Sequence, residues 1–246
     1  MALAANEGMT VFADAESGLK KAALRKRGVN IDNIRIHSEI TYDALEGLYW
    51  DLKATLEDDP DSIYCVNLDS VTEIQKLLLE QIVGNAVDKA SRRGMERDPF
   101  FIDRPDWGVV TEQMRRLTRR FRDLPCHVTF GCLEKRDTDS DGAIVYSPAL
   151  TPAYATDLMG YVDVIIHTQV VEIAGKEFYV GTCVPVGKYL GKDRFAALPR
   201  TLVNPSVPRI VGYINGDIDQ ETDPLQIEAR EAQAAEKPAK KEEEKT

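Results

Sequence analysis

The stretch SIYCVNLDSVTE, residues 62–73, decides the fold of this chain. A short apolar run follows the breaker DDPD at residues 58–61 and ends in the carboxylate of Asp69 and the hydroxyl of Ser70. This pattern predicts a buried central strand whose charged end lies at the carboxyl edge of a parallel sheet. Open α/β folds bind their ligands in the crevice outside that edge.

Asp69 has two interpretations that the residues alone leave open. Magnesium binds a few carboxylates together with water and phosphate oxygens, so an Asp at the end of a strand can hold this ion directly or through water. Alternatively, Asp69 caps the helix that is predicted to begin near residue 71, because Asp and Ser are both favoured at a helix N-cap.

Length and composition fit one α/β domain with tails. The chain has 246 residues, of which 43% are hydrophobic and 29% charged, as is usual for a globular protein. No apolar stretch is long enough for a membrane span and no signal peptide is recognisable, so we expect no membrane partner and a cytoplasmic location. The four cysteines lack metal-ligand spacing, which predicts reduced thiols and no zinc site.

Basic residues concentrate in segments 20–27, 92–104 and 115–122 of a chain whose net charge is −10. The net charge argues against a protein that coats nucleic acid with its whole surface, but it leaves room for a local site. The arginines of segment 115–122 repel one another at i,i+4 spacing, and a solvated helix face is the favoured interpretation of them.

Residues 92–107 are the better candidate for a nucleic-acid site. Gly94, Pro99 and Pro105 predict a long irregular loop in this segment, and such loops are usually functional or mobile. Its cations alternate with aromatic residues, a mixture suited to phosphate charge and base stacking in single-stranded DNA. The candidate residues are Arg92, Arg93, Arg97, Phe100, Phe101, Arg104 and Trp107. The alternative is a contact between subunits.

Two further predicted strands deliver carboxylates to their ends. The strand TVFA at residues 10–13 is followed by Asp14 and Glu16, and the strand CHVTFGCL at residues 126–133 is followed by Glu134. Because adjacent parallel strands end at the same edge of a sheet, we expect these carboxylates and that of the central strand to converge in one cleft. A capped turn accounts for one of the two carboxylates after the first strand, but not for both.

The remaining elements complete an α/β fold. Apolar residues at helical spacing predict helices over 42–56, 71–90 and 109–122. An antiparallel hairpin is predicted from 163–171 and 178–184, followed by a basic, glycine-punctuated loop.

The end of the chain is predicted to contain a last short strand at 209–214 and then a tail. From residue 217 onward Glu, Lys, Ala and Gln dominate, which predicts a disordered charged segment over 217–246. The predicted fold class is therefore α/β: a mostly parallel sheet flanked by helices over residues 1–216, with a C-terminal antiparallel hairpin and a disordered tail.

The order of the strand ends resembles the core of the RecA-like P-loop ATPases, over residues 1 to about 214. The segment TVFADAE, residues 10–16, is similar to the RecA segment whose glutamate activates the attacking water, and VNLDS, residues 66–70, is similar to the Walker B strand. The segment KDRFAALP, residues 192–199, resembles the basic pair that reaches the phosphates of a neighbouring subunit. Phage-encoded RecA-like recombination ATPases, of the AAA type, match these features most closely.

The resemblance implies roles for particular residues. It implies catalytic roles for Glu16, Glu134, Lys192 and Arg194. It implies nucleotide binding by Asp14, Asp69 and Ser70, with Asp69 as the magnesium ligand. The implied cofactors are ATP and Mg²⁺, and the implied partners are single-stranded DNA, further copies of the chain, and a single-strand-binding or annealing protein in the host cytoplasm.

One departure from the family is serious, because the pattern Gly-x-x-x-x-Gly-Lys-Ser/Thr occurs nowhere in the chain. That loop supplies backbone amides, a lysine and a magnesium-binding hydroxyl to the phosphates. In the family it precedes the segment similar to residues 2–8, so we expect a truncated chain that binds ATP weakly or not at all.

Two hypotheses follow, and whether the protein is an enzyme stays open between them. The first is an ATPase that acts with DNA in recombination or annealing, with the missing loop supplied by an upstream segment. The second is a non-catalytic RecA-fold protein that works as a binding or scaffolding partner.

Overall fold

Strand β3 (Cys65–Asp69) lies in the interior of a four-stranded parallel sheet, as the sequence predicts. A computed structural model describes residues 1–138 and 141–243, and their side chains as far as residue 234. The chain divides into two compact units. The parallel-sheet unit comprises Met1–Lys135 and Pro148–Tyr161, and the antiparallel unit comprises Arg136–Ser147 and Val162–Thr246. The predicted core over residues 1–216 thus spans all of the first unit and much of the second.

The parallel sheet has the order β2-β1-β3-β4. Its other strands are β1 (Thr10–Asp14), β2 (Ile34–His37) and β4 (His127–Phe130), and each pairing is parallel. Every residue of β1 is buried, because β1 lies between two strands and both faces of the sheet are covered. The mostly parallel α/β fold class is confirmed.

Helical elements cover both faces of this sheet. They are η1 (Ala2–Asn6), α1 (Lys21–Lys26), η2 (Ile31–Asn33), α2 (Tyr42–Asp58), α3 (Val71–Ser91), α4 (Arg104–Arg122) and α5 (Pro152–Tyr161). On one face Phe12 packs with Ala5, Val29 and Ile34. Helix α2 buries four leucines at helical spacing, which is the periodicity that predicts it from sequence.

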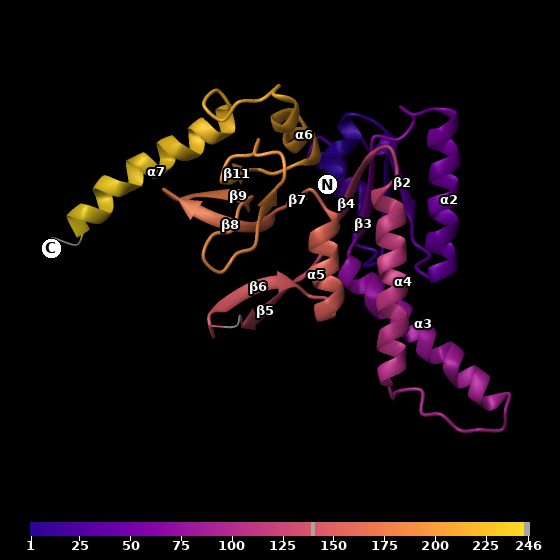
Figure 1. The fold of residues 1–246 in the computed structure, drawn as a ribbon. Helices are drawn as coiled ribbons and strands as arrows, with labels where there is room; N and C mark the ends of the chain where they lie inside the picture. The colour runs from indigo at the N-terminus through magenta and orange to yellow at the C-terminus, as the bar shows by residue number, and fades with distance from the viewer. Residues whose placement is uncertain (139–140, 244–246) are drawn as a thin grey trace. The chain divides into compact units, whose positions relative to one another are not determined.

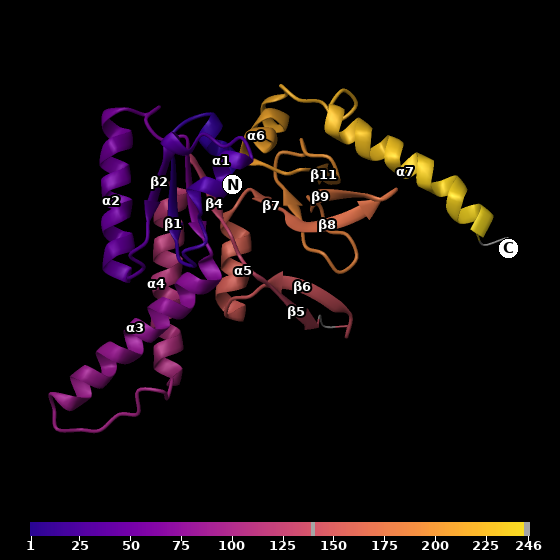
Figure 2. The ribbon, with the colours of Figure 1, turned by 180° about the vertical axis from the view of Figure 1, so that it is seen from behind.

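Helices α3 and α4 pack against each other and extend together beyond the edge of the sheet (Figures 1 and 2). We call their far ends and the connecting residues 92–103 the α3–α4 arm. Helix α4 begins earlier than predicted, at Arg104, because Asp103 and Asp106 form a reciprocal capping box and Pro105 stands in the first turn.

The antiparallel unit contains the predicted hairpin. Strands β8 (His167–Ile173) and β9 (Lys176–Thr182) pair across a turn at Ala174 and Gly175, both of which have positive φ. Strand β11 (Thr201–Val203) pairs with the other edge of β9, so β8 is an edge strand. Short ladders also join β7 (Val164–Ile165) to β10 (Lys192–Asp193), and β5 (Glu134–Thr138) to β6 (Ile144–Pro148).

The predicted strand at 209–214 is wrong, because this segment lies in helix α6 (Val207–Asn215). Pro208 fits the first turn of a helix, and Gly216 ends it in the left-handed conformation with φ 79°. The apolar run is short enough to suit either element, and these two flanking residues decide between them.

Part of the predicted tail is folded. Helix α7 (Pro224–Glu243) packs Leu225, Ala229 and Ala232 against a cluster that contains Ile173 and Phe178. The structure therefore differs from the predicted boundary at 217, since regular structure continues past it. Residues 244–246 and the side chains after 234, which belong to the predicted disordered segment, lie outside the described residues.

All four cysteines are free thiols, which agrees with the expectation of reduced cysteines. Within the part of the chain that the structure describes, no helix combines the length and the apolarity that crossing a membrane requires.

Candidate functional site

Asp14 and Asp69 lie directly opposite each other at the carboxyl ends of β1 and β3. The strand register pairs Thr10 with Cys65 and runs without a break to Asp14 and Asp69. Adjacent parallel strands thus bring two carboxylates to one edge of the sheet, as the sequence predicts. The Asp69–Ser70 peptide bond, immediately after β3, is cis.

The N-cap of α3 is Ser70 and not Asp69, so the capping interpretation of Asp69 is wrong. The Ser70 hydroxyl accepts a hydrogen bond from the Glu73 backbone N–H at 3.2 Å. The same hydroxyl donates to Glu16 Oε1 at 2.6 Å, and this bond brings Glu16 to the sheet edge. The Asp69 side chain therefore does not cap the helix.

Asp14 has local hydrogen-bond partners, whereas the Asp69 carboxylate has none among the described residues. The two Asp14 oxygens accept from the backbone N–H groups of Gly18 and Leu19, each at 3.1 Å, and so hold the loop after β1. In residues 1–138 and 141–243, no group donates a hydrogen bond to the Asp69 carboxylate. Asp69 is thus a partly buried anion without a donor, beside two other carboxylates.

The electrostatics of Asp69 reflect this arrangement. Burial raises the pKa of Asp69 above its ordinary value, and the neighbouring charges of Glu16 and Asp14 raise it further. The α-amino group of Met1 opposes them as the smallest of the four influences. A divalent cation placed between these carboxylates would relieve the repulsion that raises the pKa.

The carboxylates fit the magnesium half of a nucleotide site. Mg²⁺ takes one or two protein carboxylates and fills its octahedron with water and phosphate oxygens, so a complete protein cage is not required. Accordingly, no group of three or more His, Cys, Asp or Glu side chains in the described ranges is arranged as a metal cage. Asp69 would hold the ion, with Asp14 and Glu16 nearby. The phosphates fit less well, because the chain has no Gly-x-x-x-x-Gly-Lys-Ser/Thr loop to bind them.

Gly131 is a site residue that sequence reasoning missed. A Cβ atom at this position would lie 2.8 Å from Asp69 Oδ1, so only glycine lets the end of β4 approach this carboxylate. Its backbone also joins the strands, since Gly131 N–H donates to Leu68 O and Gly131 O accepts from Val71 N–H. The available signal was a glycine at the end of a predicted strand, which often marks close backbone approach.

Glu134 lies four residues beyond β4, at the start of β5, and its side chain is exposed. Its charge is not among those that shift the pKa of Asp69. The structure therefore brings Asp14, Glu16, Asp69 and Ser70 together at the carboxyl ends of β1 and β3.

The α3–α4 arm presents most of the predicted nucleic-acid residues to solvent. Phe100 is 92% exposed and Phe101 60%, and Arg92, Arg93 and Arg104 are exposed as well. The predicted irregular loop is confirmed over residues 92–103, whereas Arg104 already lies in the first turn of α4.

Arg97 and Trp107 differ from the rest of that set. Arg97 forms ion pairs with Asp106, which is buried, and with Asp103 at 3.4 Å, so it holds the start of α4. Trp107 borders a groove of about 610 Å³ in the parallel-sheet unit, together with Leu79 and Pro152. Both side chains therefore have structural partners that the sequence did not indicate.

The arginines of α4 are mostly paired along the helix and with its neighbours. Arg115 contacts Asp157 at 2.6 Å, Arg120 pairs with Glu46, and Arg119 lies 3.7 Å from Glu112. The expected solvated helix face is therefore confirmed only in part: Arg116 and Arg119 are exposed, whereas Arg115 and Arg120 are half-buried against neighbouring acids.

Lys192, Asp193 and Arg194 form an ordered turn in the antiparallel unit. The Asp193 carboxylate accepts hydrogen bonds from the backbone N–H groups of Phe195, Ala197 and Leu198. Lys192 Nζ donates to Val162 O at 2.6 Å, and Arg194 pairs with Asp163 at 2.6 Å on the surface. The turn is thus held chiefly by Asp193, and the Arg194–Asp163 pair contributes under about 1 kcal/mol because it is exposed.

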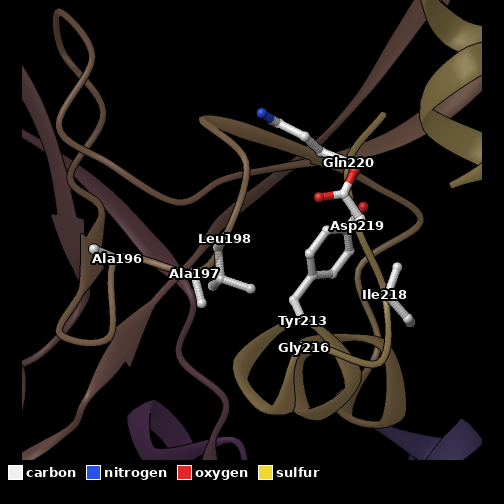
Figure 3. A pocket seen from close by; sticks show the side chains of 8 residues that line it. All are labelled: Ala196, Ala197, Leu198, Tyr213, Gly216, Ile218, Asp219 and Gln220. Atoms are coloured by element: carbon white, nitrogen blue, oxygen red, sulfur yellow. The ribbon is translucent and has the colours of Figure 1, made fainter. Parts of the chain in front are cut away.

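A small pocket in the same unit contains none of the predicted site residues (Figure 3). It has a volume of about 290 Å³ and lies between the loop after this turn and the end of α6. Its lining residues are Ala196, Ala197, Leu198, Tyr213, Gly216, Ile218, Asp219 and Gln220. The Tyr213 hydroxyl is committed to Asp223, at 2.5 Å, so the pocket offers little chemistry.

A parallel α/β sheet with paired carboxylates at its carboxyl edge is a feature of proteins of the P-loop NTPase-like class. The family model described as AAA domain matches residues 2–195 of this chain. The chain therefore belongs to the AAA domain family, whose members generally use ATP and Mg²⁺. A search of curated proteins found no match.

Proposed function

We propose that this protein is a RecA-like ATPase component that acts with single-stranded DNA in phage recombination or annealing, in the host cytoplasm. The observation that carries the nucleotide part is the sheet-edge cluster, in which Asp69 stands beside Asp14 and Glu16 without a hydrogen-bond donor. An unpaired, partly buried carboxylate is costly, and a bound cation is its natural partner.

Each residue of the sheet-edge cluster has a separate role in the proposed function. Bound Mg²⁺ would supply charge neutralisation for phosphate oxygens. Asp69 would hold the ion, and Asp14 keeps the loop 15–19 in place through its two backbone hydrogen bonds. Glu16 is exposed to solvent and accepts a proton from the attacking water. Ser70 orients Glu16 through the 2.6 Å hydrogen bond and so acts as a positioning residue. The family resemblance implies a catalytic role for Glu134 as well, although this residue lies at the start of β5.

Lys192 and Arg194 are proposed to serve the nucleotide of a neighbouring subunit. A cation supplied in trans raises phosphoryl-transfer rates by about three to five orders of magnitude. Arg194 can leave Asp163 at little cost, because both partners of this ion pair are about half exposed. The protein would therefore act as a homo-oligomer, with a single-strand-binding or annealing protein as a further partner.

The α3–α4 arm is the proposed DNA contact. Arg92, Arg93 and Arg104 supply phosphate charge, and Phe100 and Phe101 supply exposed rings on which bases can stack. Arg97 supports the arm through its ion pairs at the start of α4, and Trp107 follows on the first turn of that helix.

A second candidate is a non-catalytic RecA-fold protein that binds or scaffolds. The absence of the phosphate-binding sequence from all 246 residues favours it. Calorimetric titration of ATP with Mg²⁺ into this chain should give affinity weaker than about 1 mM, because the amides and lysine of the loop supply most of the phosphate binding. Micromolar, magnesium-dependent binding would contradict that expectation.

A variant with the family's phosphate-binding loop and helix joined in front of Met1 separates the two candidates. Under the ATPase proposal it binds and hydrolyses ATP, and Glu16→Gln then abolishes hydrolysis while binding persists. Arg194→Ala should do the same, and a mixture of the two variants should recover part of the activity at shared interfaces. A looped variant that binds ATP without turnover would favour the scaffolding protein.

Anisotropy of a labelled oligo-dT tests the DNA part on the chain as it is. Arg92→Ala with Arg93→Ala should lower the slope of log affinity against log salt by about 1.4, at roughly 0.7 for each phosphate contact on a single strand. Phe100→Ala should cost about 1–3 kcal/mol of binding through lost stacking. Arg116→Ala with Arg119→Ala on α4 is the matched control and should change little. Equal losses in both double variants would remove the arm from the proposal.

A further inference from the structure

The outward face of the β8–β9 hairpin combines exposed apolar side chains with unpaired acids. We define the hairpin face as Thr168, Val170, Glu172, Glu177 and Tyr179, all of which are exposed. The opposite side of the hairpin is covered, because Ile173 and Phe178 pack against α7. Among the residues of its own unit that the structure describes, none therefore covers the hairpin face.

Val170 and Tyr179 stand directly opposite each other and form the apolar centre of this face. Val170 is 53% exposed and Tyr179 58%. A cross-strand pair of a β-branched and an aromatic residue is a favourable unit that gains further from being covered.

Glu172 and Glu177 are also directly opposite each other, two residues along each strand. Like charges in this position destabilise a hairpin unless a cation lies nearby. No cation in the described ranges pairs with either glutamate, and the adjacent Lys176 is engaged with Glu228 of α7. The chain thus carries an unfavourable acidic pair beside an exposed apolar pair.

The opposite charge is found on α1 and its flanks, in the parallel-sheet unit. Lys20, Lys21, Arg25, Lys26 and Arg27 are all exposed. No acidic residue occurs between Glu16 and Asp32. In the described residues none of these cations pairs with a carboxylate, although Lys20 and Lys21 donate to backbone carbonyls.

We call residues 20–27 the α1 surface. Small apolar side chains lie among its cations. Ala22 and Ala23 are exposed and lie between Lys21 and Arg25. Small side chains between cations are complementary in charge to a valine–tyrosine pair that has two glutamates beside it.

We propose that the hairpin face of one copy of this chain docks onto the α1 surface of a second copy. The contact is heterologous, since it joins two different surfaces, and it therefore builds a ring or an open filament and not a closed twofold dimer. This inference rests on the proposed self-association, but it specifies the surfaces that the proposed function leaves unassigned.

Sedimentation velocity over a range of concentrations, without nucleotide or DNA, tests the contact. Glu172→Lys with Glu177→Lys should weaken self-association about tenfold or more, because it puts like charges on both sides. Arg25→Glu with Arg27→Glu should do the same. The chain that carries all four substitutions should regain most of the association, because the charges are then exchanged. High salt should weaken the wild-type contact.

Glu39→Lys with Glu80→Lys is the matched control, since it makes the same charge change at exposed positions outside both surfaces. Circular dichroism should show that every variant is folded. A wild-type chain that stays monomeric would overturn this inference and the proposed oligomer together. Self-association that survives the charge reversals, or that the fourfold exchange fails to restore, would overturn this contact alone. Loss of oligo-dT binding without loss of self-association in Arg25→Glu with Arg27→Glu would assign α1 to nucleic acid instead.

Discussion

Asp223 and Asp69 are both aspartates, but they differ in their hydrogen-bond donors and in the direction in which their pKa is shifted. Asp223 is 3% exposed and accepts hydrogen bonds from Arg209, the Tyr213 hydroxyl and the Leu225 backbone N–H. Burial alone would raise the pKa of Asp223, but the bonds from Arg209 and Tyr213 lower it below its ordinary value. Asp69 has no such donors, and its pKa is raised.

Under the proposed function, the difference separates a carboxylate that stabilises the fold from one that binds a ligand. The antiparallel unit contains the cation for Asp223, and this completed pair joins α6 to the start of α7. The sheet edge gathers Asp69, Asp14 and Glu16 without a guanidinium or ammonium side chain paired to Asp69 in the described ranges. A fold gains nothing from that repulsion, and the proposed function explains it by a cation bound beside Asp69.

Removing the carboxylate of Asp223 should produce the largest effect. Asp223→Ala leaves the Arg209 charge partly buried without a partner, which should cost about 3–5 kcal/mol of unfolding free energy. Urea denaturation followed by circular dichroism measures this loss. Asp217→Ala, an exposed residue six positions earlier, is the control and should stay within about 0.5 kcal/mol. A small effect of Asp223→Ala would mean that the two carboxylates do not differ as we argue.

Filling the space beside Asp69 should have an intermediate effect. Gly131→Ala introduces a Cβ atom 2.8 Å from Asp69 Oδ1, so the carboxylate or the end of β4 must move. We expect a loss of about 1–3 kcal/mol of unfolding free energy. Gly84→Ala in α3 is the matched control, because its Cβ meets nothing within 4 Å, and it should stabilise the chain by about 0.5–1 kcal/mol. Similar stabilities for the two variants would show that the approach of β4 to Asp69 is not tight.

The pH dependence should differ in sign between the two carboxylates. The folded pKa of Asp69 lies above the ordinary value of 3.8, so the folded state binds more protons between these values and stability falls as pH rises through them. The folded pKa of Asp223 lies below 3.8, so its contribution is present above 3.8 and is lost as pH falls through the folded value.

Urea denaturation at a series of pH values separates these contributions. Relative to wild type, Asp69→Asn should become more stable as the pH rises from 3.8 toward neutrality, while Asp223→Asn should become less stable as the pH rises to 3.8. Parallel profiles for the two variants would contradict the opposite pKa shifts.

The sequence predicts the sheet edge well because strand ends follow from simple patterns. An apolar run that stops at a carboxylate defines both the burial of β3 and the position of Asp69, and the parallel pairing brings Asp14 opposite it. The partners of these side chains depend on tertiary contacts that periodicity does not encode. The Ser70–Glu16 bond and the approach of Gly131 are of this kind.

The misassigned elements show the same limit. Residues 209–214 are apolar enough for a strand, but Gly216 and Pro208 make them a helix. The polar sequence at the start of α7 predicts a disordered tail. In the structure, Asp223 and Ala229 are buried there because Arg209 and the β8–β9 hairpin cover them. The residues that pack against a short apolar run or a polar segment determine which secondary structure it forms.

The most direct test of the sheet-edge site is the effect of Mg²⁺ on thermal unfolding, with sodium chloride at matched ionic strength as the reference. If Asp69 holds the ion, Mg²⁺ at about five times its dissociation constant should stabilise the wild-type chain by about 1 kcal/mol. Asp69→Asn should abolish this gain, while Asp61→Asn, at an exposed position, should retain it. A gain of equal size in Asp69→Asn, or no gain in the wild-type chain at any Mg²⁺ concentration, would contradict the account.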